Sequence, residues 1–235
     1  MLNRLFTLSV VFTLFISSIT ASHKVYLIHG YGGIGKKFKK IESALERKGY
    51  SCEIFEYQSI SEDIDTISKH LSKKITSENF DTVSFVTHSM GALIVRSLYQ
   101  YIDSTAFFPV INRFVMIAPP NQGLSVADFC SQFFILRKIC GPNINNLTTN
   151  PISGASRYPI PTCQVGLING ISVYKNGYNI FLEGNNDGVI PVEKSKLGIE
   201  SDVAYVISSH GTLVKNEKVV KMAVNFLVKG KFEKI

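Results

Sequence analysis

The sequence predicts an α/β fold with a mostly parallel central sheet, helices on both faces and one lid-like insertion. Short apolar segments alternate with amphipathic segments of helical period, which is the order of strand and helix in such folds. The apolar segments are nearly continuous, as in strands buried on both faces. The segment 121–161 breaks this order and predicts the insertion. A chain of 235 residues, 45% of them hydrophobic and 18% charged, suits one domain.

The first half of the chain carries the clearest pattern. The apolar run 24–29 predicts a strand, and a glycine-rich turn leads from it into a helix that ends near Gly49. Residues 51–57 predict the next strand. In 61–76 four aliphatic residues share one helical face, which predicts an amphipathic helix; they are Ile64, Ile67, Leu71 and Ile75.

The second half continues the alternation around the insertion. The remaining predicted strands are 82–88, 111–118, 163–169 and 202–208, and the remaining predicted helices are 90–102 and 213–227. Asn176-Gly177 is a frequent tight-turn pair and predicts a β-hairpin within 171–182.

The segment 1–22 has the composition of a secretory signal peptide. Arg4 precedes an almost wholly apolar run, 5–19, and small residues follow in Thr20-Ala21-Ser22. The apolar run is shorter than the roughly 20 residues of a membrane-spanning helix. We therefore expect cleavage, a mature domain 23–235 and an exported protein, periplasmic or secreted. A retained N-terminal anchor and a buried helix are the alternatives.

The charge pattern excludes some partners. The formal net charge is +7, and the basic residues are scattered except in the cluster 36–40. That cluster predicts either a solvated helix face or attraction to anionic lipid or another acidic partner. Arginine stripes and paired aromatic platforms are absent, so nucleic-acid binding is not expected. The glycine-rich run 30–35 matches neither a phosphate-binding nor a dinucleotide-binding fingerprint.

The cysteines and histidines do not predict a metal site. No spacing of these residues resembles a zinc motif, and we expect neither a metal nor a cofactor. An even number of cysteines in an exported chain permits disulfides, and Cys130–Cys140 is the favoured pair. The four cysteines are Cys52, Cys130, Cys140 and Cys163.

A serine stands where a predicted strand turns sharply into a predicted helix. The segment Thr87–Gly91, Thr-His-Ser-Met-Gly, lacks only the first glycine of the G-x-S-x-G nucleophile elbow. Small residues are needed there because the serine backbone is strained and the strand and helix cross closely. Ser89 is therefore a candidate nucleophile, and a serine that only caps the helix is the alternative.

An activated serine needs a base and a carboxylate that orients the base. His210 is the only histidine after Ser89, and it directly follows the last predicted strand. Asp187 lies in a polar loop between the two, in the chain order Ser, acid, His. A surface histidine and an ordinary turn aspartate are the alternatives. Asp202 and Glu183 are competing acids, although Asp202 begins the last strand at the end opposite His210. Asp128 lies in the insertion and could serve only by an unusual route.

The oxyanion of an acyl-transfer intermediate needs two hydrogen-bond donors. One is expected from the backbone N–H of Met90, directly after the candidate nucleophile. The second is expected from the loop after strand 24–29, at Tyr31, with Gly30 as the alternative. His29 is expected to brace this loop rather than act as a second base.

Five motifs in order resemble the lipase and esterase family of α/β-hydrolases across nearly the whole mature length. They are Val25–Gly33, Thr87–Gly91, Ala118–Gly123 (Ala-Pro-Pro-Asn-Gln-Gly), Asn186–Pro191 and Ser209-His210. The resemblance implies the α/β-hydrolase fold, a Ser89–Asp187–His210 triad and an oxyanion hole from Tyr31 and Met90. It also implies the activity of a bacterial serine hydrolase that cleaves carboxylic esters.

The insertion bears on the substrate. Its segment 128–140 is too apolar for a solvated loop, and Phe129, Phe133 and Phe134 are candidate substrate-binding residues. They are expected to form a lid over the serine and an acyl-chain groove, or to anchor the insertion to the core. Fatty-acyl esters are the first expected substrate and small soluble esters the second. Contact with a membrane surface is a further expectation, in keeping with the basic cluster 36–40. An acyltransferase or amidase with the same triad and a non-catalytic lipid-binding protein are the alternative functions.

Overall fold

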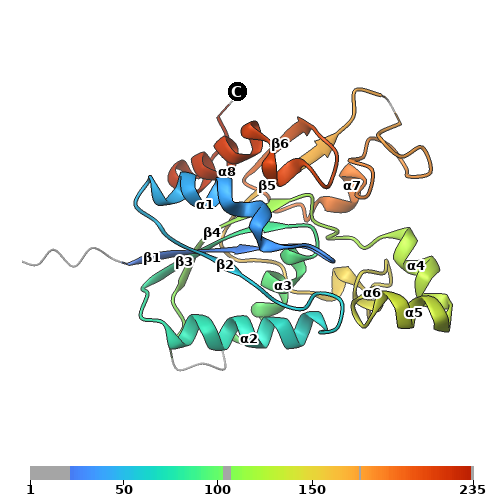
Figure 1. The fold of residues 1–235 in the computed structure, drawn as a ribbon, viewed down its shortest axis with the longest axis horizontal. Coiled ribbons are helices and arrows are strands. Elements are labelled where there is room, and N and C mark those ends of the chain that lie inside the picture. The colour runs from blue at the N-terminus through green and yellow to red at the C-terminus, as the bar shows by residue number, and fades with distance from the viewer. Residues whose placement is uncertain (1–21, 103–106, 175, 234–235) are drawn as a thin grey trace, which may run out of the picture.

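A computed structural model describes residues 22–102, 107–174 and 176–233. The described chain is built around one sheet of six parallel strands in the order β2-β1-β3-β4-β5-β6 (Figure 1). The strands are β1 (His23–Ile28), β2 (Ser51–Phe55), β3 (Thr82–His88), β4 (Val110–Ile117), β5 (Gln164–Ile171) and β6 (Asp202–Ile207). The predicted α/β class and the parallel sheet are confirmed.

Helices cover both faces of this sheet. One face carries α1 and α8, which pack against each other, and the other carries α2 and α3 (Figure 1). The helices are α1 (Lys39–Glu46), α2 (Ile64–Ser77), α3 (Gly91–Leu98), α4 (Ser125–Gln132), α5 (Phe134–Cys140), α6 (Asn143–Asn146), α7 (Val192–Ser195) and α8 (Glu217–Lys229). None of the described helices is long and apolar enough to cross a membrane.

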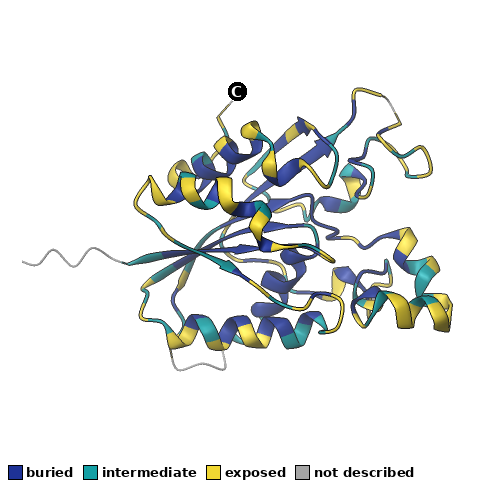
Figure 2. Cartoon of the chain, in the orientation of Figure 1, coloured by how far each residue is buried: buried dark blue, intermediate teal, exposed yellow. Residues whose placement is uncertain are grey.

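The core lies between the sheet and its helices. Buried residues follow the strands and the inward faces of the helices, while exposed residues follow the outer faces (Figure 2). The strand β1 is buried from Val25 to Ile28, as a nearly continuous apolar run predicts. The four aliphatic residues predicted to share one face of α2 are all buried.

The strand order decides which chain segments meet at the site. The strand β3 lies between β1 and β4, with Thr87 opposite Ile28 on one side and Met116 on the other. Parallel strands place their carboxyl ends at the same edge of the sheet. The loops after β1, β3 and β4 therefore meet there.

The segment between β4 and β5 forms the short helices α4, α5 and α6 beyond the carboxyl edge of the sheet (Figure 1). Buried apolar residues attach it to the core, among them Leu124, Leu147 and Tyr158. Asn143 ties it to α2, because its amide oxygen accepts from the Ile64 N–H and its amide nitrogen donates to the Ser59 carbonyl. The insertion is thus attached to the rest of the domain both by buried apolar side chains and by the hydrogen bonds of Asn143.

Two local expectations differ from the structure. The predicted hairpin within 171–182 is wrong for the described residues, which form turns and bends there. The Asn186 amide supplies the hydrogen bonds that a second strand would supply: it donates to Asn176, Asn179 and Gly184 carbonyls and accepts from the Asn179 and Gly188 N–H groups. The favoured Cys130–Cys140 disulfide is not formed, since all four cysteines are free thiols. The expected signal peptide falls on 1–22, of which 1–21 lie outside the described residues.

Candidate active site

The turn from β3 into α3 holds Ser89 in the left-handed region. Its φ is 53°, a conformation that L-residues other than glycine adopt rarely. The Ser89 N–H donates to the Ile117 carbonyl of β4 at 2.9 Å, which fixes the turn to the neighbouring strand. A strained serine between a strand and a helix is the geometry of a nucleophile elbow rather than of a simple helix cap.

Two glycines allow the chain to approach this turn closely. A Cβ on Gly91 would lie 2.5 Å from the Ile28 carbonyl oxygen and 2.6 Å from that of His29. A Cβ on Gly30 would lie 2.7 Å from Ser89 Cβ and 3.3 Å from its hydroxyl oxygen. The loop after β1 therefore touches the serine directly, and a larger residue at either glycine position would displace it.

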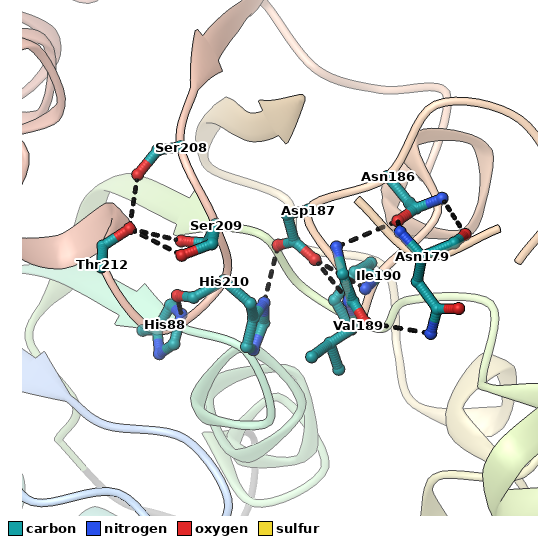
Figure 3. A network of polar contacts seen from close by, with 11 residues as sticks. His88, Asn179, Asn186, Asp187, Val189, Ile190, Ser208, Ser209, His210 and Thr212 are labelled. Carbon is teal, nitrogen blue, oxygen red and sulfur yellow. Dashed lines mark hydrogen bonds and ion pairs between the residues drawn. The ribbon is translucent and has the colours of Figure 1, made fainter. Parts of the chain in front are cut away.

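The structure brings Asp187 and His210 together, 23 residues apart in sequence (Figure 3). The His210 Nδ1 lies 2.7 Å from Asp187 Oδ2, and the His210 N–H donates to the Asp187 carbonyl at 2.9 Å. The other carboxylate oxygen accepts from the N–H groups of Val189 (3.0 Å) and Ile190 (2.7 Å). Asp187 is 1% exposed, so these hydrogen bonds hold a buried carboxylate in one orientation.

This pairing decides the tautomer of His210. A carboxylate only accepts, so Nδ1 carries the proton and Nε2 keeps its lone pair. His210 and Ser89 line the same cavity. Among the described contacts the Ser89 hydroxyl makes no hydrogen bond to the imidazole, and such contacts are often long before substrate binds. His210 has the tautomer of a general base facing the cavity of the serine.

His88 contacts the candidate base, His210, through a hydrogen bond and through its ring. Its Nε2 donates to the His210 carbonyl at 3.1 Å, and the two imidazole rings lie 4.5 Å apart between centroids (Figure 3). Burial, followed by the nearby His210, holds the pKa of His88 well below its usual value. His88 is therefore neutral at physiological pH. No sequence pattern predicted this role for His88, although it directly precedes the candidate nucleophile.

The loop after β1 lines the cavity of Ser89 and carries a backbone donor without a partner among the described residues. The Gly30 carbonyl accepts from the His29 ring at 2.9 Å and from the Gly33 N–H at 3.0 Å, so it is fixed from two sides. The Tyr31 N–H belongs to the same trans peptide and points in the opposite direction. Neither Tyr31 N–H nor Met90 N–H has a hydrogen-bond partner among the described residues. Both predicted oxyanion donors are thus free, and His29 braces the loop as expected.

The remaining contacts of this loop connect it to its surroundings. The Gly32 N–H donates to the Ser59 hydroxyl at 2.9 Å, and the Tyr31 hydroxyl donates to the Cys140 carbonyl at 2.7 Å. Tyr57 stacks on the His29 ring with centroids 4.1 Å apart, and its hydroxyl donates to the His29 carbonyl. The loop is held from the core and from the end of α5.

The cavity at Ser89 is small and belongs to the loops after β1, β3 and β6. Its volume is about 110 Å³. Its lining residues are His29, Gly30, Tyr31, Gly32, Gly33, Ile34, Lys37, Phe38, His88, Ser89, His210, Gly211 and Val214. In the described part of the chain no group of three histidine, cysteine or acidic residues is arranged to hold a metal ion.

The three candidate substrate-binding phenylalanines do not line this cavity. Phe129, Phe133 and Phe134 are 57%, 48% and 72% exposed, and the first two rings contact each other at 5.0 Å. Ala127 is the one buried residue of α4, and α5 has none, so the three phenylalanines contribute little to attaching the insertion to the core. Spacing in sequence identified an apolar segment but could not give the direction in which it faces.

The competing acids have other partners. Asp202 accepts hydrogen bonds from the N–H groups of Val203 and Phe232 at the start of β6. Asp128 accepts from the N–H and the hydroxyl of Thr149 within the insertion. Glu183 is exposed. None of these three carboxylates contacts His210.

One buried cation supports the elbow from the other side of α3. Arg96 is 1% exposed and donates to Asn121, to Pro159 at 3.0 Å and to Tyr158. Burial lowers the pKa of Arg96 to about 10. Asn121 belongs to the Ala118–Gly123 motif, so Arg96 joins the elbow helix to both ends of the insertion. No local pattern in the sequence indicated this role.

Comparison with known proteins agrees with the architecture. No family model matches the chain, and no curated protein matches it by sequence. Among solved structures it is similar to the mature form of the lipase BlEst2 of Bacillus licheniformis, with a TM-score of 0.63 and 16% identity over 89% of this chain and 91% of that one. It is also similar to an extracellular α/β-hydrolase of a Paenibacillus species, with a TM-score of 0.56 and 18% identity over 88% of this chain and 98% of that one. A metagenomic carboxyl esterase, MGS0156, is similar with a TM-score of 0.59 and 17% identity over 81% of this chain and 65% of that one. The chain has the α/β-hydrolase fold.

Proposed function

We propose that the chain is a serine hydrolase that cleaves carboxylic esters through an acyl-enzyme. The observation that carries this proposal is the hydrogen bond of 2.7 Å between Asp187 and His210, which selects the neutral tautomer with its proton on Nδ1 in a ring that lines the cavity of Ser89. A neutral imidazole with a free Nε2 is the form that takes a proton from a serine hydroxyl. The similarity to lipases and esterases supports the same reaction class, by analogy of fold.

The proposed reaction follows from these positions. The Ser89 hydroxyl oxygen attacks the ester carbonyl carbon while His210 Nε2 takes its proton. The oxyanion that develops accepts hydrogen bonds from the N–H groups of Tyr31 and Met90. The tetrahedral intermediate then breaks the bond to the alcohol, which leaves with the proton from His210. Water deacylates the serine by the same steps in reverse order.

The cavity favours a small group at the reacting carbon. Pockets for drug-sized ligands measure about 300–1,000 Å³, whereas this cavity measures about 110 Å³. We therefore propose esters with a short acyl group rather than a fatty-acyl chain enclosed by the insertion. Profiling hydrolysis of p-nitrophenyl esters from acetate to palmitate tests this proposal. A maximum at long chains would contradict it.

Covalent labelling tests the reaction itself. A fluorophosphonate is expected to label the protein once, at Ser89, and p-nitrophenyl butyrate is expected to be hydrolysed. Ser89→Ala should lose both properties, while Ser77→Ala, which changes an exposed serine of α2, should keep them. Folded wild-type protein that neither labels nor hydrolyses any ester contradicts the proposal. Product analysis with added alcohols and amines distinguishes hydrolysis from acyl or amide transfer.

We further propose that the α4–α5 hairpin (Ser125–Cys140) contacts an anionic lipid surface. Its exposed apolar residues are Val126, Phe129, Phe133, Phe134, Ile135 and Ile139. Arg137 and Lys138 stand among them, exposed and without an ion pair in the described part of the chain. Apolar side chains with adjacent cations are the composition that binds the interface of anionic membranes. The end of this hairpin also accepts the hydrogen bond from Tyr31, so docking would occur beside the cavity.

Vesicle sedimentation tests this surface. The protein is expected to bind vesicles of phosphatidylcholine with phosphatidylglycerol better than vesicles of phosphatidylcholine alone. Phe134→Ser with Ile139→Ser should weaken binding, and Phe107→Ser, which changes an exposed aromatic residue near the start of β4, should not. Equal loss in both variants, or self-association of the free protein through the hairpin, would overturn the assignment.

A further inference from the structure

The basic cluster 36–40 divides into paired and unpaired lysines. Lys39 forms an ion pair with Glu42 at 2.6 Å, and Lys40 forms one with Glu217 at 2.5 Å. Both pairs belong to the exposed outer side of α1. Lys37 lies two residues before Lys39, in the 3₁₀ turn Gly35–Phe38, and has no ion pair among the described residues. It is half-buried and lines the cavity of Ser89.

The charge of Lys37 is not balanced within that cavity. None of the lining residues is an aspartate or a glutamate. Asp187 is buried behind His210, and Glu56, whose carboxylate lies 3.6 Å from His29 Nε2, lines a separate hollow with Phe55 and Tyr57. Burial lowers the pKa of His29 most, and the Lys37 charge lowers it further, against a larger opposite effect of the Glu56 carboxylate. Burial and then His210 lower the pKa of His88, and Lys37 adds to them, which agrees with an ammonium group near both rings.

We propose that Lys37 is the specificity residue of this cavity and that the substrate is an ester carrying a carboxylate or phosphate near its scissile bond. The inference rests on the proposed ester hydrolysis and names the chemical class of its substrate. An ammonium group has three donors and no acceptor, so its natural partner in the cavity is an anion. The low-dielectric wall beside it strengthens the attraction relative to bulk water.

The same arrangement orients the substrate. The serine, the oxyanion donors and the ammonium lie around one small cavity, so an anion bound at Lys37 leaves few orientations for the ester carbonyl. The anion could stand on the acyl side or on the alcohol side of the ester. Matched substrates distinguish these two sources.

The experiment compares kcat/KM for two pairs of esters. The acyl-side pair is mono-p-nitrophenyl glutarate against p-nitrophenyl valerate. The two esters differ only at the end of the acyl chain, where glutarate has a carboxylate and valerate has a methyl group. The alcohol-side pair is 3-carboxyphenyl butyrate against 3-methylphenyl butyrate. Each charged-to-neutral ratio is measured for wild type, Lys37→Met, Lys37→Arg and Lys36→Met. Lys36 is an exposed neighbour that does not line the cavity and serves as the matched control.

In one of the two pairs, Lys37→Met is expected to lower the charged-to-neutral ratio about tenfold, the effect of losing one hydrogen bond to a charged group. Lys37→Arg should keep most of the ratio and Lys36→Met all of it. Raising the ionic strength from about 0.02 to 0.5 M should lower the ratio in wild type more than in Lys37→Met.

A ratio that Lys37→Met leaves unchanged in both pairs, or that Lys36→Met lowers equally, overturns the inference. Turnover of the neutral esters reports separately on the proposed hydrolase function. If the wild-type protein hydrolyses none of the neutral esters, the proposed hydrolase function is contradicted, rather than the proposed specificity of Lys37.

Discussion

The substitution Asp187→Asn isolates the role of the buried carboxylate. In the protein one oxygen of Asp187 accepts from the N–H groups of Val189 and Ile190, and the other accepts from His210 Nδ1. An asparagine must keep its amide oxygen toward the two N–H groups, because its NH₂ cannot accept from them. The NH₂ group then faces His210 and becomes a donor to Nδ1. The imidazole proton moves to Nε2, where it blocks transfer from Ser89.

The expected loss in kcat is about 10⁴-fold, the loss found when a triad aspartate is replaced by asparagine and the histidine takes the wrong tautomer. That factor corresponds to about 5.4 kcal/mol of transition-state stabilisation. Turnover of p-nitrophenyl butyrate measures it, with thermal unfolding as the check on folding. The control is Asp202→Asn, whose carboxylate contacts N–H groups at the other end of the sheet. A loss below tenfold for Asp187→Asn, or an equal loss for Asp202→Asn, would refute the tautomer argument.

Three further substitutions test the surroundings of the site. Gly30→Ala should lower kcat at least tenfold, because its Cβ would stand 2.7 Å from Ser89 Cβ; steady-state kinetics measure this and unchanged kcat would contradict it. Arg96→Met leaves the carbonyls it binds without donors and should lower the free energy of unfolding by about 3–5 kcal/mol in denaturant titrations. Burial lowers the pKa of His88 in the folded protein, so below about pH 6.5 the unfolded chain binds more protons than the folded one. The free energy of unfolding therefore decreases as the pH is lowered. His88→Asn should reduce that slope by up to about 1.4 kcal/mol per pH unit, and an unaltered slope would contradict the assignment.

The sheet could be predicted because its information is local. Each strand is a short apolar run, and each covering helix repeats its apolar residues at helical spacing, so single segments such as 24–29 or 61–76 suffice. Ser89, Asp187 and His210 could be singled out because each follows a strand in the required chain order. Their actual meeting depends on the strand order, which places β3 between β1 and β4 and β6 beside β5.

The failures share a physical cause, which is contact between segments distant in sequence. The turn pair Asn176-Gly177 does not form a hairpin because the Asn186 amide takes over its backbone hydrogen bonds from about ten residues away. The phenylalanines of α4 and α5 are largely exposed, whereas residues elsewhere in the insertion, among them Leu124, Leu147 and Tyr158, are buried. Lys39 pairs with Glu42 at the local i,i+3 spacing, but Lys40 pairs with Glu217 far along the chain, and the place of Lys37 at the cavity likewise depends on segments distant in sequence.

The missing glycine at Thr87 shows how the close approach at the elbow is distributed. Thr87 is fully buried, keeps the regular register of β3 and points its hydroxyl toward the Val115 carbonyl at 3.5 Å, so its side chain has space within the sheet. The tight contacts occur instead at Gly91, against the end of β1, and at Gly30, against Ser89 itself. The requirement for small residues is therefore met by the helix side of the elbow and by the loop that carries the proposed oxyanion donor. In this chain the proposed nucleophile and that loop depend on each other's glycines, and the strand side of the motif is free to carry a β-branched residue.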